Sequence, residues 1–421
     1  MSEENWYKVD NVAKVFLATH NARDTRTMRV SATLTEKIDP DLLQQALLSV
    51  IETRKLFQVR IRRGLFWHYL EPTNAVPKVC EEYERPCPKM YGRRDKQLLH
   101  YSVTYYHNRI NLEVFHALSD GTGILDFLNT LVIKYLKLKY PKDLSLQDAV
   151  LTTQSASADR EENSYRQFYE KNEKVLSGDS IRRAYHIRGG KLPYDQLQFF
   201  EISMESAVVL ARAKEIGVGV TALVAARLMM AIYRDMPLLK KKQPISLSIP
   251  VNLRNYYPSE TSRNFFISIM LIHSFSGEET EESLAAELHR QMKEELQPDQ
   301  IRAAMNRNQK CEQLPWVRVV PLAIKQPYIR MAARKNNRKC SAVLSNLGRM
   351  QPPKEAEKYV TGYTALCSHN ELFMTVYTYH DRMCLGITSG YRSTSVLKNF
   401  LRSFSSEEHE IEIQASEVVR I

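Results

Sequence analysis

Cysteine is scarce in this chain, with six residues among 421. No two of them form a C-x-x-C pair, so the sequence gives no support for a disulfide framework, a zinc ribbon or a thioredoxin-like site. Long apolar runs are also missing, because no stretch approaches the ~20 uninterrupted apolar residues of a membrane-spanning helix. The N-terminus, MSEENWYKVD, is polar and acidic and resembles neither a signal peptide nor a transit peptide. We therefore expect a cytoplasmic protein with reduced thiols and no membrane span.

Common catalytic signatures are missing as well. The chain has no G-x-S-x-G, no G-x-x-x-x-G-K-[ST] and no H-E-x-x-H. One stretch, Gly217 to Ala222, matches G-x-G-x-x-[GA], but it follows the helical pattern AVVLARAKEI where a dinucleotide site needs a strand. It therefore predicts a tight turn between two helices. The histidines His68, His107, His273, His369 and His380 are scattered along the chain without the spacing of metal ligands, so no metal site is expected.

The composition is that of a globular protein with a basic surface. Apolar residues make up 43% and charged residues 25%, and the length is about three times that of a typical domain, which favours two lobes. The net charge of +11 favours an anionic partner, such as a phosphorylated cofactor, a nucleic acid or an anionic membrane surface. No aromatic residues are interleaved with the basic runs, so no nucleic-acid partner is expected. These runs are Lys240 to Lys242 and the cluster Arg334, Lys335, Arg338 and Lys339.

Strand and helix patterns alternate through the first half. Residues 29–34 read as a half-buried strand, and Asp39-Pro40 begins a helix with an N-cap and a first-turn proline. Residues 59–61 and 66–70 read as strands, residues 101–106 and 110–115 as a hairpin, and residues 122–139 as an apolar helix. The polar stretch 141–195 is interpreted as the connection between lobes spanning 1–178 and 190–421.

The second half repeats this alternation. Strands are predicted at 198–204, 245–249, 265–273, 360–366, 372–379 and 383–388. Helices are predicted at 207–214, 281–297, 316–334 and 394–403, and at 221–234 with Thr221 as its N-cap. The chain as a whole is therefore predicted to be an α/β protein with mixed sheets flanked by helices.

The most informative segment runs from the hairpin into the apolar helix. His116 ends a strand, Asp120 and Gly121 lie on the following turn, and a helix begins near Thr122. A histidine at the end of a strand can project into a cleft, where its neutral imidazole accepts a proton near pH 7. Asp120 suits a different role, pairing with a buried arginine to hold the loop. Gly121 allows close backbone approach where a side chain would block the site.

This segment resembles a known family. His116 to Gly121 is similar to the H-x-x-x-D-G motif of the chloramphenicol-acetyltransferase-like acyltransferase superfamily, which includes alcohol O-acetyltransferases and nonribosomal peptide condensation domains. Two further stretches are similar to segments of that superfamily's second lobe: Ile249 to Arg254 with Arg263-Asn264-Phe265, and Val343 to Gly348. Together they spread from residue 116 to residue 348, which is most of the chain.

The resemblance implies two chloramphenicol-acetyltransferase-like lobes with an active-site tunnel between them. An acyl-CoA thioester would be the donor and a small alcohol or amine the acceptor, with His116 as general base and no metal or permanently bound cofactor. Ser345, Asn346 and a backbone N–H near Gly121 are the candidate donors to the oxyanion. Asp120 would be structural, paired with Arg254 or with Arg54. If the Ser345 strand lines the cleft, the cluster at Arg334, Lys335, Arg338 and Lys339 would lie at the mouth of the CoA site.

Departures from the motifs narrow the resemblance. Phe115 stands where condensation domains have a first histidine, which favours a free-standing O-acyltransferase over a peptide condensation domain. The D-F-G-W-G motif of the superfamily's plant acyltransferases is also absent, which argues against that branch. The resemblance is strongest to bacterial alcohol-acetyltransferase-like proteins. Two alternatives remain open: a condensation-type enzyme that depends on a carrier protein, and a non-catalytic member of the fold that binds an acyl ligand or a protein.

Overall fold

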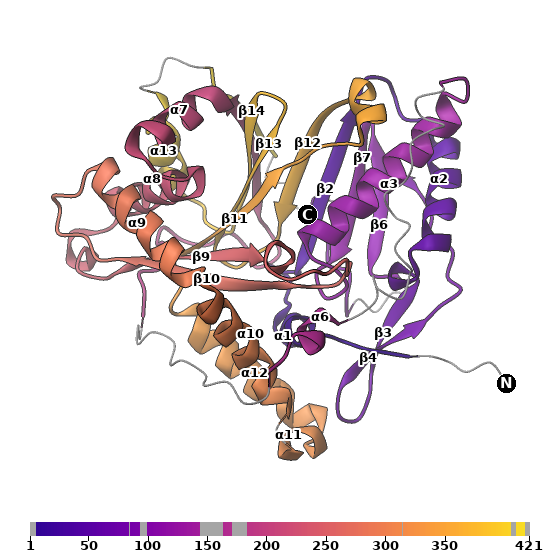
Figure 1. Ribbon diagram of the computed structural model, residues 1–421, viewed down its shortest axis with the longest axis horizontal. Helices are drawn as coiled ribbons and strands as arrows, with labels where there is room; N and C mark the ends of the chain where they lie inside the picture. The colour runs from indigo at the N-terminus through magenta and orange to yellow at the C-terminus, as the bar shows by residue number, and fades with distance from the viewer. Residues whose placement is uncertain are drawn as a thin grey trace.

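A computed structural model of the chain describes residues 6–83, 85–92, 99–143, 163–170, 183–313, 315–405 and 410–416. Two sheets carry the architecture, one in each half of the molecule, and helices cover their outer faces (Figure 1). Each half has its own cluster of buried apolar side chains. The predicted α/β class with mixed sheets is confirmed, since both sheets contain parallel and antiparallel pairs.

The first lobe is built on a sheet in the order β12-β2-β7-β6-β5, flanked by α2 (Pro40–Thr53) and α3 (Gly121–Lys139). The strands are β2 (Thr27–Leu34), β5 (Cys80–Glu81), β6 (Tyr101–Tyr106), β7 (Arg109–Phe115) and β12 (Val360–Cys367). A small sheet joins β1 (Tyr7–Lys8), β3 (Val59–Arg63) and β4 (His68–Pro72), and α1 (Asn11–Thr19) and η1 (Lys55–Phe57) complete the lobe. The predicted hairpin and the Asp39 N-cap are confirmed.

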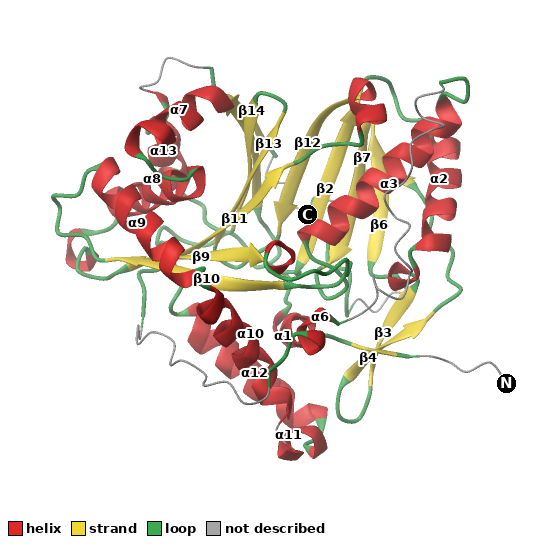
Figure 2. Cartoon of the chain, viewed as in Figure 1, coloured by secondary structure: helices red, strands yellow, loops and turns green. Residues whose placement is uncertain are grey.

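The second lobe contains a seven-stranded sheet in the order β10-β9-β11-β13-β14-β8-β15. The strands are β8 (Gln198–Glu205), β9 (Ile245–Asn252), β10 (Phe266–His273), β11 (Ala342–Arg349), β13 (Leu372–Tyr379), β14 (Arg382–Ser389) and β15 (Glu412–Ala415). On the left in Figure 2, its outer face is covered by α7 (Ser206–Ile216), α8 (Val220–Asp235), α9 (Glu281–Glu295) and α13 (Ser395–Arg402).

Further helices lie below this sheet in Figure 2, where α1 packs against α12. They are α6 (Ser164–Gln167), α10 (Pro298–Gln313), α11 (Pro315–Val319) and α12 (Leu322–Asn337), and short turns are η2 (Leu238–Lys240), η3 (Leu253–Asn255) and η4 (Lys354–Tyr359). The helix predicted at 316–334 is two helices, because Pro321 occupies the N-cap position of α12 and separates it from α11. The helices α1 and α10 and the short strands β1, β5 and β15 were not predicted from the sequence.

Two local predictions around α8 have different outcomes. The G-x-G-x-x-A stretch is confirmed as a turn between helices, with Gly217 at a φ of 77° that favours glycine. The N-cap prediction is wrong: Gly219 occupies that position, and Thr221 lies inside the first turn. In the described part of the chain, no single helix is long and apolar enough to cross a membrane. The consecutive helices α7 and α8 reach that length and composition only together, and they are bent by 92°.

One strand links the two lobes. Much of the stretch 141–195, predicted to connect the lobes, lies outside the described residues. The strand β12 follows most of the second lobe in the sequence, yet it pairs with β2 and forms an edge of the first lobe's sheet. This strand also packs against β14 of the second sheet, with close contact at Gly386. A Cβ at Gly386 would lie 1.8 Å from the carbonyl oxygen of Ala365, so only glycine permits this approach. The lobes are therefore joined by a strand crossover as well as by the chain between them.

Candidate active site

His116 lies between the two lobes. It directly follows Phe115, the last residue of β7, and its backbone N–H donates to the carbonyl oxygen of Arg26 at 2.7 Å, just before β2 begins. Its imidazole is bracketed by the ring of Phe16 from α1, with centroids 4.5 Å apart, and the ring of Phe266 from β10, at 5.7 Å. The first residue of the motif thus faces aromatic groups from both halves of the molecule.

The tautomer of His116 is determined by Asn264. The Asn264 amide nitrogen donates to the backbone oxygen of His116 at 3.0 Å and to the Asp10 carboxylate at 3.2 Å. Because both of these partners are acceptors, the amide oxygen must be the atom that lies 3.0 Å from Nδ1 of His116. Nδ1 therefore carries the hydrogen and donates it, which leaves Nε2 of the neutral ring as the proton acceptor.

The surroundings of His116 favour the neutral imidazole. Burial lowers the pKa of His116 below its usual 6.5, and the nearby Arg26 guanidinium acts in the same direction. The Asp120 carboxylate and the hydrogen bond to Asn264 oppose this shift without cancelling it. At neutral pH the ring is therefore uncharged, which is the protonation state that a general base requires.

Asp120 connects the loop to the second lobe. One carboxylate oxygen caps α3 by accepting from Gly123 N at 3.2 Å. The other accepts from the Arg254 guanidinium at 2.8 Å and from Phe265 N at 2.9 Å. The Arg254 guanidinium also donates to the carbonyl oxygens of Thr261 and Arg263, which hold it in place. These three hydrogen bonds engage both carboxylate oxygens of Asp120 and tie the motif loop to the second lobe.

Of the two arginines considered for Asp120, Arg54 is engaged elsewhere. Its guanidinium forms an ion pair with Asp126 at 2.5 Å and donates to the Thr130 hydroxyl at 2.9 Å. Both partners lie on α3, one and two turns beyond the motif. Arg54 therefore ties α3 to the end of α2, and Arg254 is the one of the two candidates that pairs with Asp120.

Gly121 begins α3 at the point where the lobes meet. A Cβ at this position would lie 3.1 Å from the side chain of Leu347 on β11 and 3.5 Å from that of Met28 on β2. On the other side, the Asn252 amide at the end of β9 donates to Thr122 at 3.1 Å. The N-terminus of α3, with its backbone N–H groups, is thus inserted between the ends of β9 and β11.

The two predicted oxyanion donors of β11 point to opposite faces of the sheet. Asn346 is exposed and its amide donates to the Thr221 hydroxyl on α8 at 2.7 Å, on the same face as Leu344, which belongs to the second lobe's core. Ser345 lies between them and therefore points to the other face, towards the first lobe, against which Leu347 also packs. The structure does not bring the Asn346 side chain to His116. Ser345 remains a candidate, buried and without a side-chain hydrogen bond among the described residues.

The predicted cofactor cluster lies far from His116. Arg334, Lys335, Arg338 and Lys339 occupy the end of α12 and the residues just before β11, at the edge of the sheet where β9 also begins. Asn264, which contacts His116, precedes β10 at the opposite end of β9. The strand between them has eight residues, or about 25 Å at ~3.3 Å per residue. The cluster therefore does not lie beside His116, and its role at the mouth of a CoA site stays a prediction.

Several contacts of the site were not anticipated from the sequence. Asn264 was noted only as part of an N-F pair, and its contact with His116 depends on a fold that brings residues 148 apart together. Asp10 is buried, accepts from Ala13 N at 2.7 Å as the N-cap of α1, and holds the Asn264 amide. Burial raises the pKa of Asp10, and Arg263 opposes that shift. Among the described residues, no group of three or more His, Cys, Asp or Glu side chains is placed to hold a metal ion.

Comparisons with known proteins identify the fold. No family model matches the sequence, and no curated protein matches it. Solved structures do. The trichothecene 15-O-acetyltransferase from Fusarium sporotrichioides has a TM-score of 0.61 with 11% identity, covering 95% of this chain and 94% of its own. A second structure from that organism, complexed with coenzyme A and T-2, has a TM-score of 0.62 with 9% identity, covering 96% and 99%.

Condensation domains are similar as well. The starter condensation domain of rhizomide synthetase, in a complex with C8-CoA, has a TM-score of 0.60 with 12% identity over 94% of both chains. Polyketide synthase associated protein 5 from Mycobacterium tuberculosis has a TM-score of 0.59 with 13% identity over 94% of this chain and 96% of its own. The predicted two-lobe, chloramphenicol-acetyltransferase-like fold is therefore confirmed.

Proposed function

We propose that this protein is an acyltransferase that moves an acyl group from a CoA thioester to the hydroxyl or amine of a small acceptor, with His116 as general base. The observation that carries the proposal is the His116–Asn264 pair. It leaves Nε2 as the acceptor nitrogen of a neutral, half-buried imidazole at the junction of the lobes. The fold adds support, because acetyltransferases and condensation domains share it.

The proposed reaction balances with this one base. Nε2 takes the proton of the acceptor hydroxyl as its oxygen attacks the thioester carbonyl carbon, which gives a tetrahedral oxyanion. When that intermediate collapses, the carbon–sulfur bond breaks and the proton on Nε2 passes to the departing thiolate. The products are an ester and a free thiol, and the imidazole is neutral again.

Two groups are proposed to stabilise the oxyanion. The Ser345 hydroxyl points to the first lobe's side of β11, and backbone N–H groups at the start of α3 lie beside that strand at Gly121. A helix N-terminus is a favourable place for a developing negative charge. Asp120 takes no part in proton transfer in this scheme, because its carboxylate is already bound by Arg254 and two backbone N–H groups.

A thiol-release assay tests the proposal. Acyl-CoAs of several chain lengths are crossed with a panel of alcohols and amines, and free thiol is measured over time. General-base catalysis typically contributes ~10²–10⁴-fold, so His116→Ala should lose turnover by about that factor while remaining folded. A folded His116→Ala protein within threefold of the wild type would refute the assignment.

The same assay examines the alternatives. Turnover with a carrier-bound acyl group but not with its CoA or pantetheine thioester would support the condensation-type reading over the CoA-dependent one. Binding of acyl-CoA without turnover for any acceptor, unchanged in His116→Ala, would support the non-catalytic reading. Either result would replace the proposed function.

A further inference from the structure

Two basic segments that are almost 100 residues apart meet at one edge of the second lobe. Lys240 to Lys242 precede β9, and the basic end of α12 precedes β11; these strands are parallel neighbours, so both segments lie at the same edge. The segment at residues 184–185 bridges them. Ala184 N donates to the carbonyl oxygen of Arg338 at 2.9 Å, and Tyr185 N donates to that of Pro244 at 2.8 Å.

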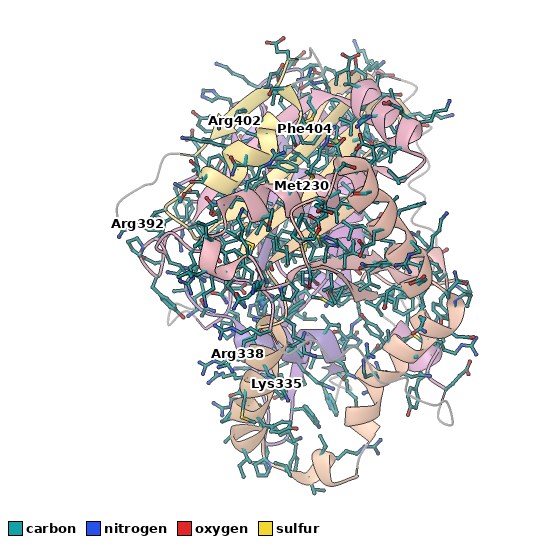
Figure 3. The ribbon with its side chains drawn as sticks, turned by 90° about the vertical axis from the view of Figure 1, so that its left-hand side faces the viewer. Met230, Lys335, Arg338, Arg392, Arg402 and Phe404 are labelled. Atoms are coloured by element: carbon teal, nitrogen blue, oxygen red, sulfur yellow. The ribbon has the colours of Figure 1, made fainter. Side chains whose placement is uncertain are left out.

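The cations at this edge are not neutralised by neighbouring carboxylates. Within the described ranges, no carboxylate forms an ion pair with any of Lys240, Lys241, Lys242, Arg334, Lys335, Arg338 and Lys339. Seen from the left of Figure 1, Lys335 and Arg338 lie on the side of the molecule that also presents Arg392 and Arg402 (Figure 3). Seven of the chain's 59 lysines and arginines thus gather at this edge of the sheet.

Apolar side chains project beside these cations. Leu238 and Leu239, on the single turn η2, are 84% and 95% exposed and directly precede the three lysines. On α12, Ile324, Tyr328 and Met331 are 61–65% exposed. Their spacing continues through Lys335 and Arg338, so one line along the helix is apolar in its first half and basic in its second. Exposed apolar groups that continue directly into basic residues are unusual for a surface that meets only water.

We propose that this edge, defined as Leu238 to Lys242 with the exposed line of α12, docks onto an anionic phospholipid bilayer. The leucines would enter the boundary between head groups and acyl chains, and the lysines and arginines would contact anionic head groups, as interfacial helices do. A bilayer is favoured over a protein partner because the leucines project as a pair from one turn. The α12 line, likewise, is a convex helix face.

This placement is independent of the proposed chemistry. The lysines before β9 lie about 25 Å from the His116 end of that strand, at ~3.3 Å per residue, whereas α12 packs against α1, which carries Phe16 beside His116. Binding to vesicles requires neither an acyl donor nor the His116 imidazole. The inference can therefore succeed or fail without the acyltransferase proposal.

Vesicle co-sedimentation of the full chain tests the inference. Partition coefficients are measured on two kinds of vesicle. One contains phosphatidylcholine alone, and the other contains about one-third phosphatidylserine, which gives its surface a negative potential. Each lysine near such a surface contributes about fivefold, so the triple variant K240E/K241E/K242E should lose about 100-fold or more of its partition coefficient. L238S/L239S should also lose about 100-fold or more, because burying each leucine contributes about 1.5 kcal/mol or more.

Matched variants separate this edge from general charge and folding effects. K37E/K55E/K78E makes the same change in net charge with exposed lysines of the first lobe and should bind nearly like the wild type. Thermal melting is recorded for every variant to confirm folding. Equal losses in the two triple variants, or equal wild-type binding to neutral and anionic vesicles, would overturn the proposal. So would wild-type binding to heparin, a soluble polyanion, without binding to either vesicle.

Discussion

Replacing Asp120 by alanine should destabilise the protein, whereas replacing His116 should not. The Asp120 carboxylate caps α3 and accepts from Arg254 and Phe265 of the second lobe, at 2.8 and 2.9 Å. Its side chain is 7% exposed and that of Arg254 is 11% exposed, so Asp120→Ala leaves a buried guanidinium without its counter-ion. Breaking a buried pair in this way typically costs about 3–5 kcal/mol.

The expected change in melting temperature follows from the size of the chain. With an unfolding entropy of ~2.1 cal/mol/K per residue, a chain of 421 residues loses about 1 °C for each ~0.9 kcal/mol, if both lobes unfold together. Asp120→Ala should therefore lower Tm by about 3–6 °C. His116→Ala removes one neutral hydrogen bond and the packing of a half-buried ring, together worth about 1–2 kcal/mol, and should lower Tm by about 1–2 °C.

Differential scanning calorimetry of the two variants and of Arg254→Ala provides the test. The double variant Asp120→Ala/Arg254→Ala should be less destabilised than the sum of the single variants, because the second substitution removes the uncompensated charge. Equal Tm values for Asp120→Ala and His116→Ala would refute the division of roles, and strictly additive effects would refute the ion pair as its cause.

Three further predictions follow from the geometry of the site and the lobe contact. Activity should fall as the pH drops through the pKa of His116, and this fall should lie below pH 6.5 because burial lowers that pKa. Asn264→Ala removes a hydrogen bond that raises the pKa of His116, so the acid limb of the pH–rate profile should move to still lower pH. The same variant should lower kcat about tenfold or more. An unmoved limb in a pH–rate profile would contradict this role for Asn264. Ser345→Ala should reduce kcat by about 100-fold with little change in Tm if its hydroxyl serves the oxyanion, and a loss below threefold would exclude it. Gly386→Ala should lower Tm by roughly 1–3 °C, because a Cβ 1.8 Å from the Ala365 carbonyl forces the sheets apart at a typical overpacking cost of ~1–3 kcal/mol; an unchanged melting curve would show that this contact is not tight.

Local patterns in the sequence determined most of the elements. The alternation of apolar residues predicted the hairpin of β6 and β7, Asp39-Pro40 predicted the start of α2, and the apolar run from about Thr122 predicted α3. These signals depend on side chains a few residues apart, so they can be read without the fold. Patterns that needed a neighbour from elsewhere were read less well: Pro321 divides a predicted helix, and Gly219 replaces Thr221 as the N-cap of α8.

Tertiary structure alone decided how the site is assembled. The spacing of His116 and Asp120 is visible in the sequence, but their partners Asn264 and Arg254 lie more than 130 residues away, and only the packing of the lobes brings them together. Side-chain direction was equally hidden, since alternation along β11 turns Ser345 and Asn346 to opposite faces, and which face meets the first lobe depends on the whole sheet. The sequence likewise does not show that the basic residues before β11 and the contact of Asn264 with His116 lie at opposite ends of β9. Sequence thus determines the local chemistry, whereas long-range packing determines which groups that chemistry can reach.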